Sequence, residues 1–185
     1  HIHRLLTSLE ERGMLDNTLV FYITGDNGAS GEGTLHGAWS APSFQNGRPE
    51  DPEWLLEHMD DFGSADCENH YNYPWAWALD SPFQWMKQVA SHFGGTRNAM
   101  AVSWPKGITD AGGLRTQFHH VVDIAPTIYE ACGITQPSIV NGIEQMEVHG
   151  TSMAYTFDDA DVADRHETQY FEMMGNRGVY HRGWM

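Results

Sequence analysis

Apolar and polar positions near the start of the chain follow two patterns, which predict a helix and then a strand. Residues 2–12 place apolar side chains at helical spacing with charged residues between them. Residues 18–23 are instead a continuous apolar run, typical of a strand buried on both faces of a parallel sheet. A helix, a short turn and a buried strand are half of an α/β unit, so the pattern predicts an α/β fold.

Later segments extend this pattern. Residues 99–103 predict a second short buried strand. Residues 123–132 predict a helix with Asp123 as its N-cap and Gly133 as its stop. Cys132 falls on the apolar face of that helix, so we expect it in the core, where free cysteine packs as a small hydrophobic residue.

The segment 29–85 has no clean period and combines glycine, proline and aspartate with many aromatic residues. We expect a long loop there, as in a lid or a substrate wall, with a short helix near residues 52–60. Residues 169–184 read as strand, turn and strand, which predicts an antiparallel hairpin. The predicted fold is α/β: a partial mixed or parallel sheet with flanking helices over residues 1–135, then the start of a small antiparallel sheet or hairpin subdomain over 136–185.

Composition excludes several classes of protein. Ten Lys and Arg residues against 25 Asp and Glu give a formal charge of −15, which argues against binding to nucleic acid or to an anionic membrane. No apolar run approaches the roughly 18 residues of a membrane-spanning helix. The two cysteines cannot form a disulfide scaffold or a four-thiolate zinc site.

Asp26 and Asn27 follow the first predicted strand, within the glycine-flanked sequence TGDNG. Ligands often bind outside the carboxyl ends of strands in open α/β sheets. One carboxylate and one amide oxygen are ligands that suit Ca²⁺ or Mg²⁺, and consecutive residues on a turn can point at one ion. The alternative is an ordinary turn, because Asp-Asn-Gly is a common turn sequence.

Lys87 and Arg97 lie on either side of a glycine-rich stretch and are candidates for binding an oxyanion, the lysine as a point charge and the arginine as a fork. The alternative is that both are solvated surface cations. Lysine is scarce in this chain, and Lys87 is one of only two, which argues for a role in binding an anion. The histidines lack zinc-site spacing, and His36, in the loop after Asp26, is the one that we expect to contact a substrate.

Five segments together resemble the formylglycine-dependent sulfatases, in particular the arylsulfatase type of the alkaline-phosphatase-like superfamily. They occur in the same order as in that family and cover most of the chain. The segments are NTLVFYITGDNG (17–28), WMKQVASHFGGTR (85–97), VSWPKGI (102–108), HHVVDIAPT (119–127) and YFEMMGNRGVYHRGW (170–184).

The resemblance implies roles for individual residues. Asp26 and Asn27 match the pair that binds the active-site calcium, and Lys87 matches the lysine that contacts the sulfate and helps the leaving oxygen to depart. The family's nucleophile is a hydrated formylglycine made from Cys or Ser in a Cys/Ser-x-Pro-x-Arg motif, and neither Cys67 nor Cys132 lies in one. We therefore expect a fragment of a longer enzyme, inactive alone, with the formylglycine in a missing N-terminal part.

The predicted function is hydrolysis of sulfuric esters, with a sulfate-ester small molecule or a sulfated glycan as substrate. A phosphonate or phosphate ester hydrolase of the same superfamily is the nearest alternative. A different class is a non-catalytic, calcium-stabilised module that binds glycans through Trp75, Trp77 and Trp85. The family resemblance also implies a periplasmic or secreted protein.

Overall fold

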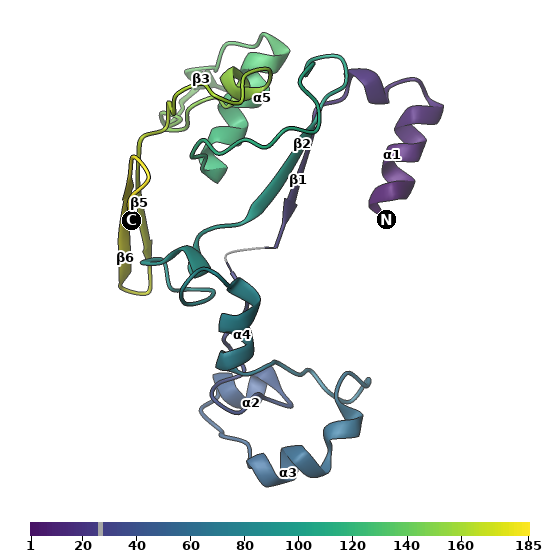
Figure 1. Ribbon diagram of the computed structural model, residues 1–185, viewed down its shortest axis with the longest axis vertical. Coiled ribbons are helices and arrows are strands. Elements are labelled where there is room, and N and C mark those ends of the chain that lie inside the picture. The colour runs from purple at the N-terminus through teal and green to yellow at the C-terminus, as the bar shows by residue number, and fades with distance from the viewer. Residues whose placement is uncertain (26–27) are drawn as a thin grey trace. The chain divides into compact units, whose positions relative to one another are not determined.

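The computed structural model describes residues 1–25 and 28–185 (Figure 1). It contains helices and small two-stranded sheets, which confirms the predicted mixed α/β class. The described residues form two compact units. One unit comprises residues 1–22, 101–169 and 180–184, and the other comprises residues 23–100, 170–179 and 185.

The first strand, β1 (Val20–Thr24), pairs with β2 (Ala99–Ser103), and both lie close to their predicted positions. The prediction that both strands are buried is wrong, because three of the five residues in each strand are exposed. Tyr22 and Ile23 are 45% and 43% exposed. Within the described part of the chain β2 is the one strand beside β1, so the apolar run has too few neighbours to cover it.

Helix α1 (Ile2–Glu11) has the predicted bounds to within one residue, but its apolar stripe is uncovered. No residue of α1 is buried, and Leu5 is 63% exposed. The period of the pattern specifies an amphipathic helix, whereas burial needs a second surface, which the described residues do not supply. None of the described helices has both the length and the apolar character needed to cross a membrane.

Three short helices occupy the segment between β1 and β2: α2 (Ala41–Gln45), α3 (Pro52–Glu57) and α4 (Tyr73–Asp80) (Figure 1). The predicted helix near residues 52–60 is confirmed, but α2 and α4 were not predicted. The starts of α3 and α4 carry local signals, because Asp51 and Asn72 each accept a backbone N–H and a proline follows each cap. The segment 29–85 is therefore a helical insertion rather than a continuous loop.

Helix α5 (Ile124–Cys132) ends as predicted at Gly133, which adopts the left-handed conformation with φ +64°. Asp123 occupies the predicted N-cap position, although its side chain makes no hydrogen bond to the first turn of α5 and instead accepts from His120 N, three residues earlier, and from Thr151 N. The prediction that Cys132 lies in the core is wrong. Cys132 is exposed, because the side of α5 that packs is the one carrying the fully buried Thr127.

Asp123 is the centre of a buried polar network in the first unit. Its side chain is completely buried. The carboxylate accepts hydrogen bonds from His120 N (2.8 Å), Thr151 N (2.8 Å) and His166 Nδ1 (2.8 and 2.9 Å to its two oxygens). One carboxylate therefore connects the start of α5 to two later segments of the chain.

The rings of two histidines, His119 and His120, lie near the Asp123 carboxylate. Burial lowers the pKa of His119 and that of His120, and the negative charge of Asp123 opposes the shift in both cases. Both ring nitrogens of His119 are buried without a hydrogen-bond partner among the described residues. Burial therefore favours the uncharged imidazole at these two positions.

The C-terminal segment contains two hairpins. The predicted one consists of β5 (Thr168–Met173) and β6 (Asn176–His181), joined by a turn at Met174 and Gly175, both with positive φ. A smaller antiparallel pair, β3 (Ile139–Val140) and β4 (Ile143–Glu144), was not predicted. Two-residue strands leave too short a sequence pattern to be recognised.

Candidate functional site

The predicted metal ligands Asp26 and Asn27 lie outside the described residues. The chain is described up to Gly25 and again from Gly28. The candidate site is therefore built from the contacts that hold the segment immediately after Asn27.

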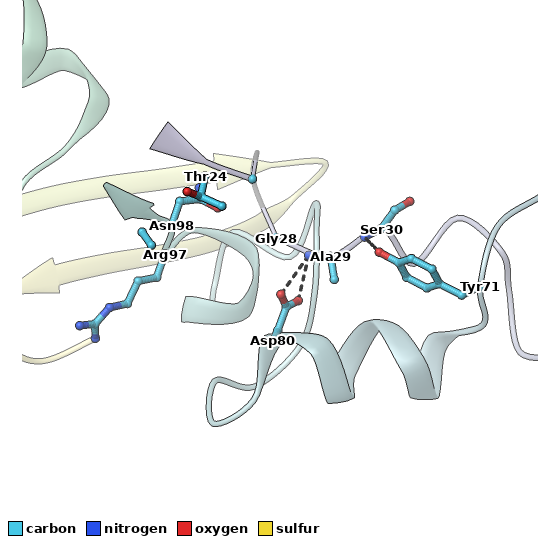
Figure 2. Close-up of a pocket in the computed structure, with 10 residues that line it drawn as sticks. Thr24, Gly28, Ala29, Ser30, Tyr71, Asp80, Arg97 and Asn98 are labelled. Carbon is cyan, nitrogen blue, oxygen red and sulfur yellow. Dashed lines mark hydrogen bonds between the residues drawn. The ribbon is translucent and has the colours of Figure 1, made fainter. Parts of the chain in front are cut away.

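Residues 28–33, the loop after β1, precede the helices of the insertion. Within this loop, residues 29 and 30 are held by two later side chains, Asp80 and Tyr71, and by the backbone of Lys87. Lys87 N donates to Ala29 O (3.0 Å). Ala29 N donates to both carboxylate oxygens of Asp80 (3.0 and 3.1 Å), and Ser30 N donates to Tyr71 Oη (3.0 Å) (Figure 2). These bonds fix the chain two and three residues after the predicted metal ligands.

Gly28 approaches its neighbours too closely to carry a side chain. A Cβ atom placed on it would lie 1.9 Å from Gly94 O and 2.8 Å from Lys87 N. Its φ of +94° is also one that other residues rarely adopt. The loop that follows β1 and the turn that carries Lys87 are thus in direct backbone contact.

Substituting Gly28 with alanine is expected to lower the free energy of unfolding by about 2–3 kcal/mol, because steric overlap adds to backbone strain. Urea unfolding followed by tryptophan fluorescence measures the loss. Gly63→Ala is the matched control, since Gly63 has a similar φ of +84° and no neighbouring atom within 4 Å of the position that a Cβ would take. Equal losses in the two variants would show that the close approach at Gly28 contributes nothing.

Lys87 lies in a turn whose backbone is unusual on both sides. Trp85 and Gln88 have φ values of +67° and +74°, in the left-handed region that bulky residues seldom occupy. Met86, between Trp85 and Lys87, is buried. Such conformations persist only where surrounding contacts hold them, and they occur often at functional sites.

The side chain of Lys87 contacts a carboxylate that the sequence analysis missed. Lys87 Nζ lies 3.9 Å from Glu32 Oε1, and Gln88 Nε2 donates to the same oxygen at 3.2 Å. His70 Nε2 and Ser30 Oγ lie 3.4 and 3.3 Å from Glu32 Oε2. The one signal in the sequence is that Glu32 stands between Gly31 and Gly33 shortly after the predicted metal ligands.

An open hollow of about 590 Å³ adjoins residues 28–30. Its lining comprises Thr24, Gly25, Gly28, Ala29, Ser30, Tyr71, Asp80, Arg97, Asn98 and Ala99 (Figure 2). Arg97 thus lies at this hollow, with its guanidinium carbon 4.8 Å from the Phe83 ring centroid and 5.8 Å from that of Phe93. The guanidinium end points away from Ala29 and Ser30 (Figure 2).

The structure brings together some of the predicted site residues and not others. Lys87 lies against the loop after β1, and Arg97 lines the hollow at the same loop. His36 is exposed, and the described contacts of Glu32 and Lys87 do not include it. The site that emerges has a cation, a carboxylate and tightly packed glycines.

The cations of this arrangement are chemically suited to an anion. Lys87 offers an ammonium group, and Arg97 offers a guanidinium that stacks on aromatic rings. In the part of the chain that the structure describes, no three His, Cys, Asp or Glu side chains are arranged to hold a metal ion. Oxygen ligands from Asp26 and Asn27 would be the chain's own donors to a hard cation.

Comparison with known proteins matches the segment that carries every one of these residues. The family model described as Sulfatase matches residues 1–134. An arylsulfatase of Klebsiella aerogenes is 29% identical over 133 residues, which cover 72% of this chain and 26% of that protein. The chain therefore spans about a quarter of the length of this curated relative. Since the family model covers well over half of its residues, the chain belongs to the sulfatase family.

Proposed function

We propose that this chain supplies part of the active site of a hydrolase that cleaves sulfuric esters. The observation that carries the proposal is the contact between the Lys87 turn and the loop after β1, made by the Lys87 N to Ala29 O bond and by Gly28. Because of this contact, a lysine lies beside the residues that directly follow Asp26 and Asn27. The name of the Klebsiella aerogenes relative, arylsulfatase, supports the same reaction class.

Lys87 acts on the charge that develops during cleavage of the ester. Hydrolysis breaks the bond between sulfur and the ester oxygen, water supplies the new oxygen on sulfur, and the departing oxygen gains a proton. An ammonium group directed at the sulfate or at the departing oxygen stabilises the negative charge there. Arg97 also lines the hollow beside this loop, with its guanidinium stacked on Phe83 and pointing away from Ala29 and Ser30.

A divalent cation, Ca²⁺ or alternatively Mg²⁺, would be held by Asp26 and Asn27 together with residues outside this chain. The chemistry of the donors fits, because one carboxylate and one amide oxygen are the ligand types that hard cations take. When bound, the ion polarises the oxygens of the sulfate group. The formylglycine nucleophile is expected in a part of the protein that this chain does not include.

The experiment uses the full-length protein and three aryl esters with the same leaving group: a sulfate, a phosphate and a phosphonate. We expect the highest kcat/KM for the sulfate, loss of activity on chelation and recovery with added Ca²⁺. Asp26→Ala should abolish that recovery, whereas Asp60→Ala, an exposed carboxylate beyond α3, should retain it.

The other outcomes identify the alternatives. Faster turnover of the phosphonate or phosphate would assign the protein to the related ester hydrolases. Saturable binding of a sulfated glycan without hydrolysis of any ester would instead favour a binding module. The exposure of Trp75, Trp77 and Trp85 (62%, 42% and 41%) is the observation that supports this second candidate, since exposed indole rings suit sugar faces.

A further inference from the structure

Four side chains lie around the carboxylate of Glu32. Its Oε1 lies 3.9 Å from Lys87 Nζ and accepts from Gln88 Nε2 at 3.2 Å. Its Oε2 accepts from Ser30 Oγ at 3.3 Å and lies 3.4 Å from His70 Nε2. These partners come from three separate segments, so Glu32 connects the Lys87 turn to the loop after β1 and to the helical insertion.

Two consecutive side chains reach the same oxygen of Glu32. In an extended chain the side chains of residues 87 and 88 would point in opposite directions. Gln88 adopts the left-handed conformation, with φ +74°, and both side chains reach Oε1. The positive φ at Gln88 is therefore found together with two neighbouring side chains, those of Lys87 and Gln88, that point to the same oxygen of Glu32.

The backbone around Glu32 is fixed by close packing. A Cβ on Gly31 would lie 2.3 Å from Met86 Sδ, and one on Gly33 would lie 2.1 Å from Tyr71 O. Glu32 therefore projects from a segment that is pressed against the residue preceding Lys87 on one side and against the insertion on the other. Hydrogen bonds from Gln88 and Ser30 hold the carboxylate itself, so its ion pair with Lys87 restricts the position of the ammonium group.

The contact also has an electrostatic cost. The protein carries a formal charge of −15, and a carboxylate near a sulfate-binding lysine repels the anionic substrate. An ammonium group has three N–H donors, so an ion pair with Glu32 does not prevent the group from meeting a substrate as well. Orientation of the lysine is a benefit that can offset the repulsion.

We propose that Glu32 is the positioning residue for Lys87: its carboxylate sets the direction of the ammonium group so that the group meets the ester oxygen of the substrate. This inference rests on the proposed function. Glu32 itself does not contact the reacting atoms, and it acts through Lys87.

The first measurement tests the contact independently of catalysis. Lys87 and Lys106 are the two lysines of this sequence, and Lys106 is exposed, so it serves as an internal reference. The full-length protein is treated with acetic anhydride, and acetylation of the two lysines is followed by peptide mass spectrometry. In Glu32→Gln the ratio of Lys87 to Lys106 acetylation should rise about two- to fivefold, because the ammonium group loses its ion pair with the Glu32 carboxylate.

The second measurement tests the role in the reaction, with aryl sulfates whose leaving groups differ in basicity. Glu32→Gln should lower kcat about tenfold for a poor leaving group and much less for a good one, with little change in KM, since a misdirected Lys87 fails most where the departing oxygen needs stabilisation. Glu32→Asp should recover part of the rate. Glu57→Gln, which removes an exposed carboxylate from α3, is the control and should leave both readouts unchanged.

The outcomes distinguish failure of the positioning role of Glu32 from failure of the proposed function. An unchanged acetylation ratio in Glu32→Gln would overturn the inference whatever the protein catalyses. A raised ratio with an equal loss of rate for every leaving group would also overturn it, because Glu32 would then have only a structural role. A raised ratio in a protein that hydrolyses no sulfate ester would refute the proposed function, and with it the positioning role in that reaction.

Discussion

Replacing Lys87 with alanine in the full-length protein is expected to lower kcat/KM for an aryl sulfate about 100- to 1,000-fold. Removal of a single fixed group that stabilises developing negative charge typically has an effect of this size. Steady-state kinetics of the purified variant measure it. Lys87→Arg should recover only part of the rate, because a guanidinium keeps the charge but not the compact shape of the ammonium group.

Lys106→Ala is the matched control for this loss. Lys106 is exposed in the turn after β2, and its backbone N–H donates to Asp16 O at 2.8 Å, a bond that alanine retains. Its substitution should therefore change kcat/KM by less than about twofold. A comparable fall in both variants would show that general loss of positive charge, rather than the placement of Lys87, controls the rate.

The elements of this fold that the sequence predicted are those with strong local signals. The apolar period specified α1, and the glycine stop specified the end of α5 at Gly133. Burial was predicted less well, because it depends on which surfaces meet. Tyr22 in β1 and Cys132 in α5 are apolar positions on correctly predicted elements, yet both are exposed.

The candidate site was predicted only in part, for a related reason. Lys87 was found because lysine is scarce in the chain and because Lys87 lies shortly before a glycine-rich stretch. The groups that hold the loop after β1 carry no such signal. Asp80 bonds to Ala29 across 51 positions and Tyr71 bonds to Ser30 across 41, and no spacing rule connects residues so far apart. Such partners follow from tertiary packing, which the sequence pattern alone does not specify.

The same limit applies to Asp123, which occupies the predicted N-cap position but whose side chain is the centre of a buried polar network rather than a cap on the first turn of α5. A cap of this kind typically contributes about 1 kcal/mol. A buried carboxylate that accepts bonds from two backbone amides and a histidine contributes more, because its removal leaves those donors without a partner. The two interpretations therefore differ in the stability loss that they predict.

Asp123→Ala is accordingly expected to lower the free energy of unfolding by about 3–5 kcal/mol, as for other buried pairs that lose one partner. Urea unfolding followed by fluorescence measures the change, and Asp123→Asn, which keeps one acceptor oxygen, should lose less. Asp161→Ala, an exposed carboxylate in the same unit, should leave the unfolding midpoint unchanged.

The double variant Asp123→Ala/His166→Ala tests whether Asp123 stabilises the fold through the buried network or only as a cap on α5. His166 Nδ1 bonds to both oxygens of Asp123, so the two substitutions remove one shared interaction, and their combined loss should be smaller than the sum by about 0.5–3 kcal/mol. A cap that acted on α5 alone would give additive losses, since His166 lies outside that helix. Additivity together with a loss near 1 kcal/mol for Asp123→Ala would restore the cap interpretation, because it would mean that the bonds to Thr151 and His166 contribute little to the stability of the fold.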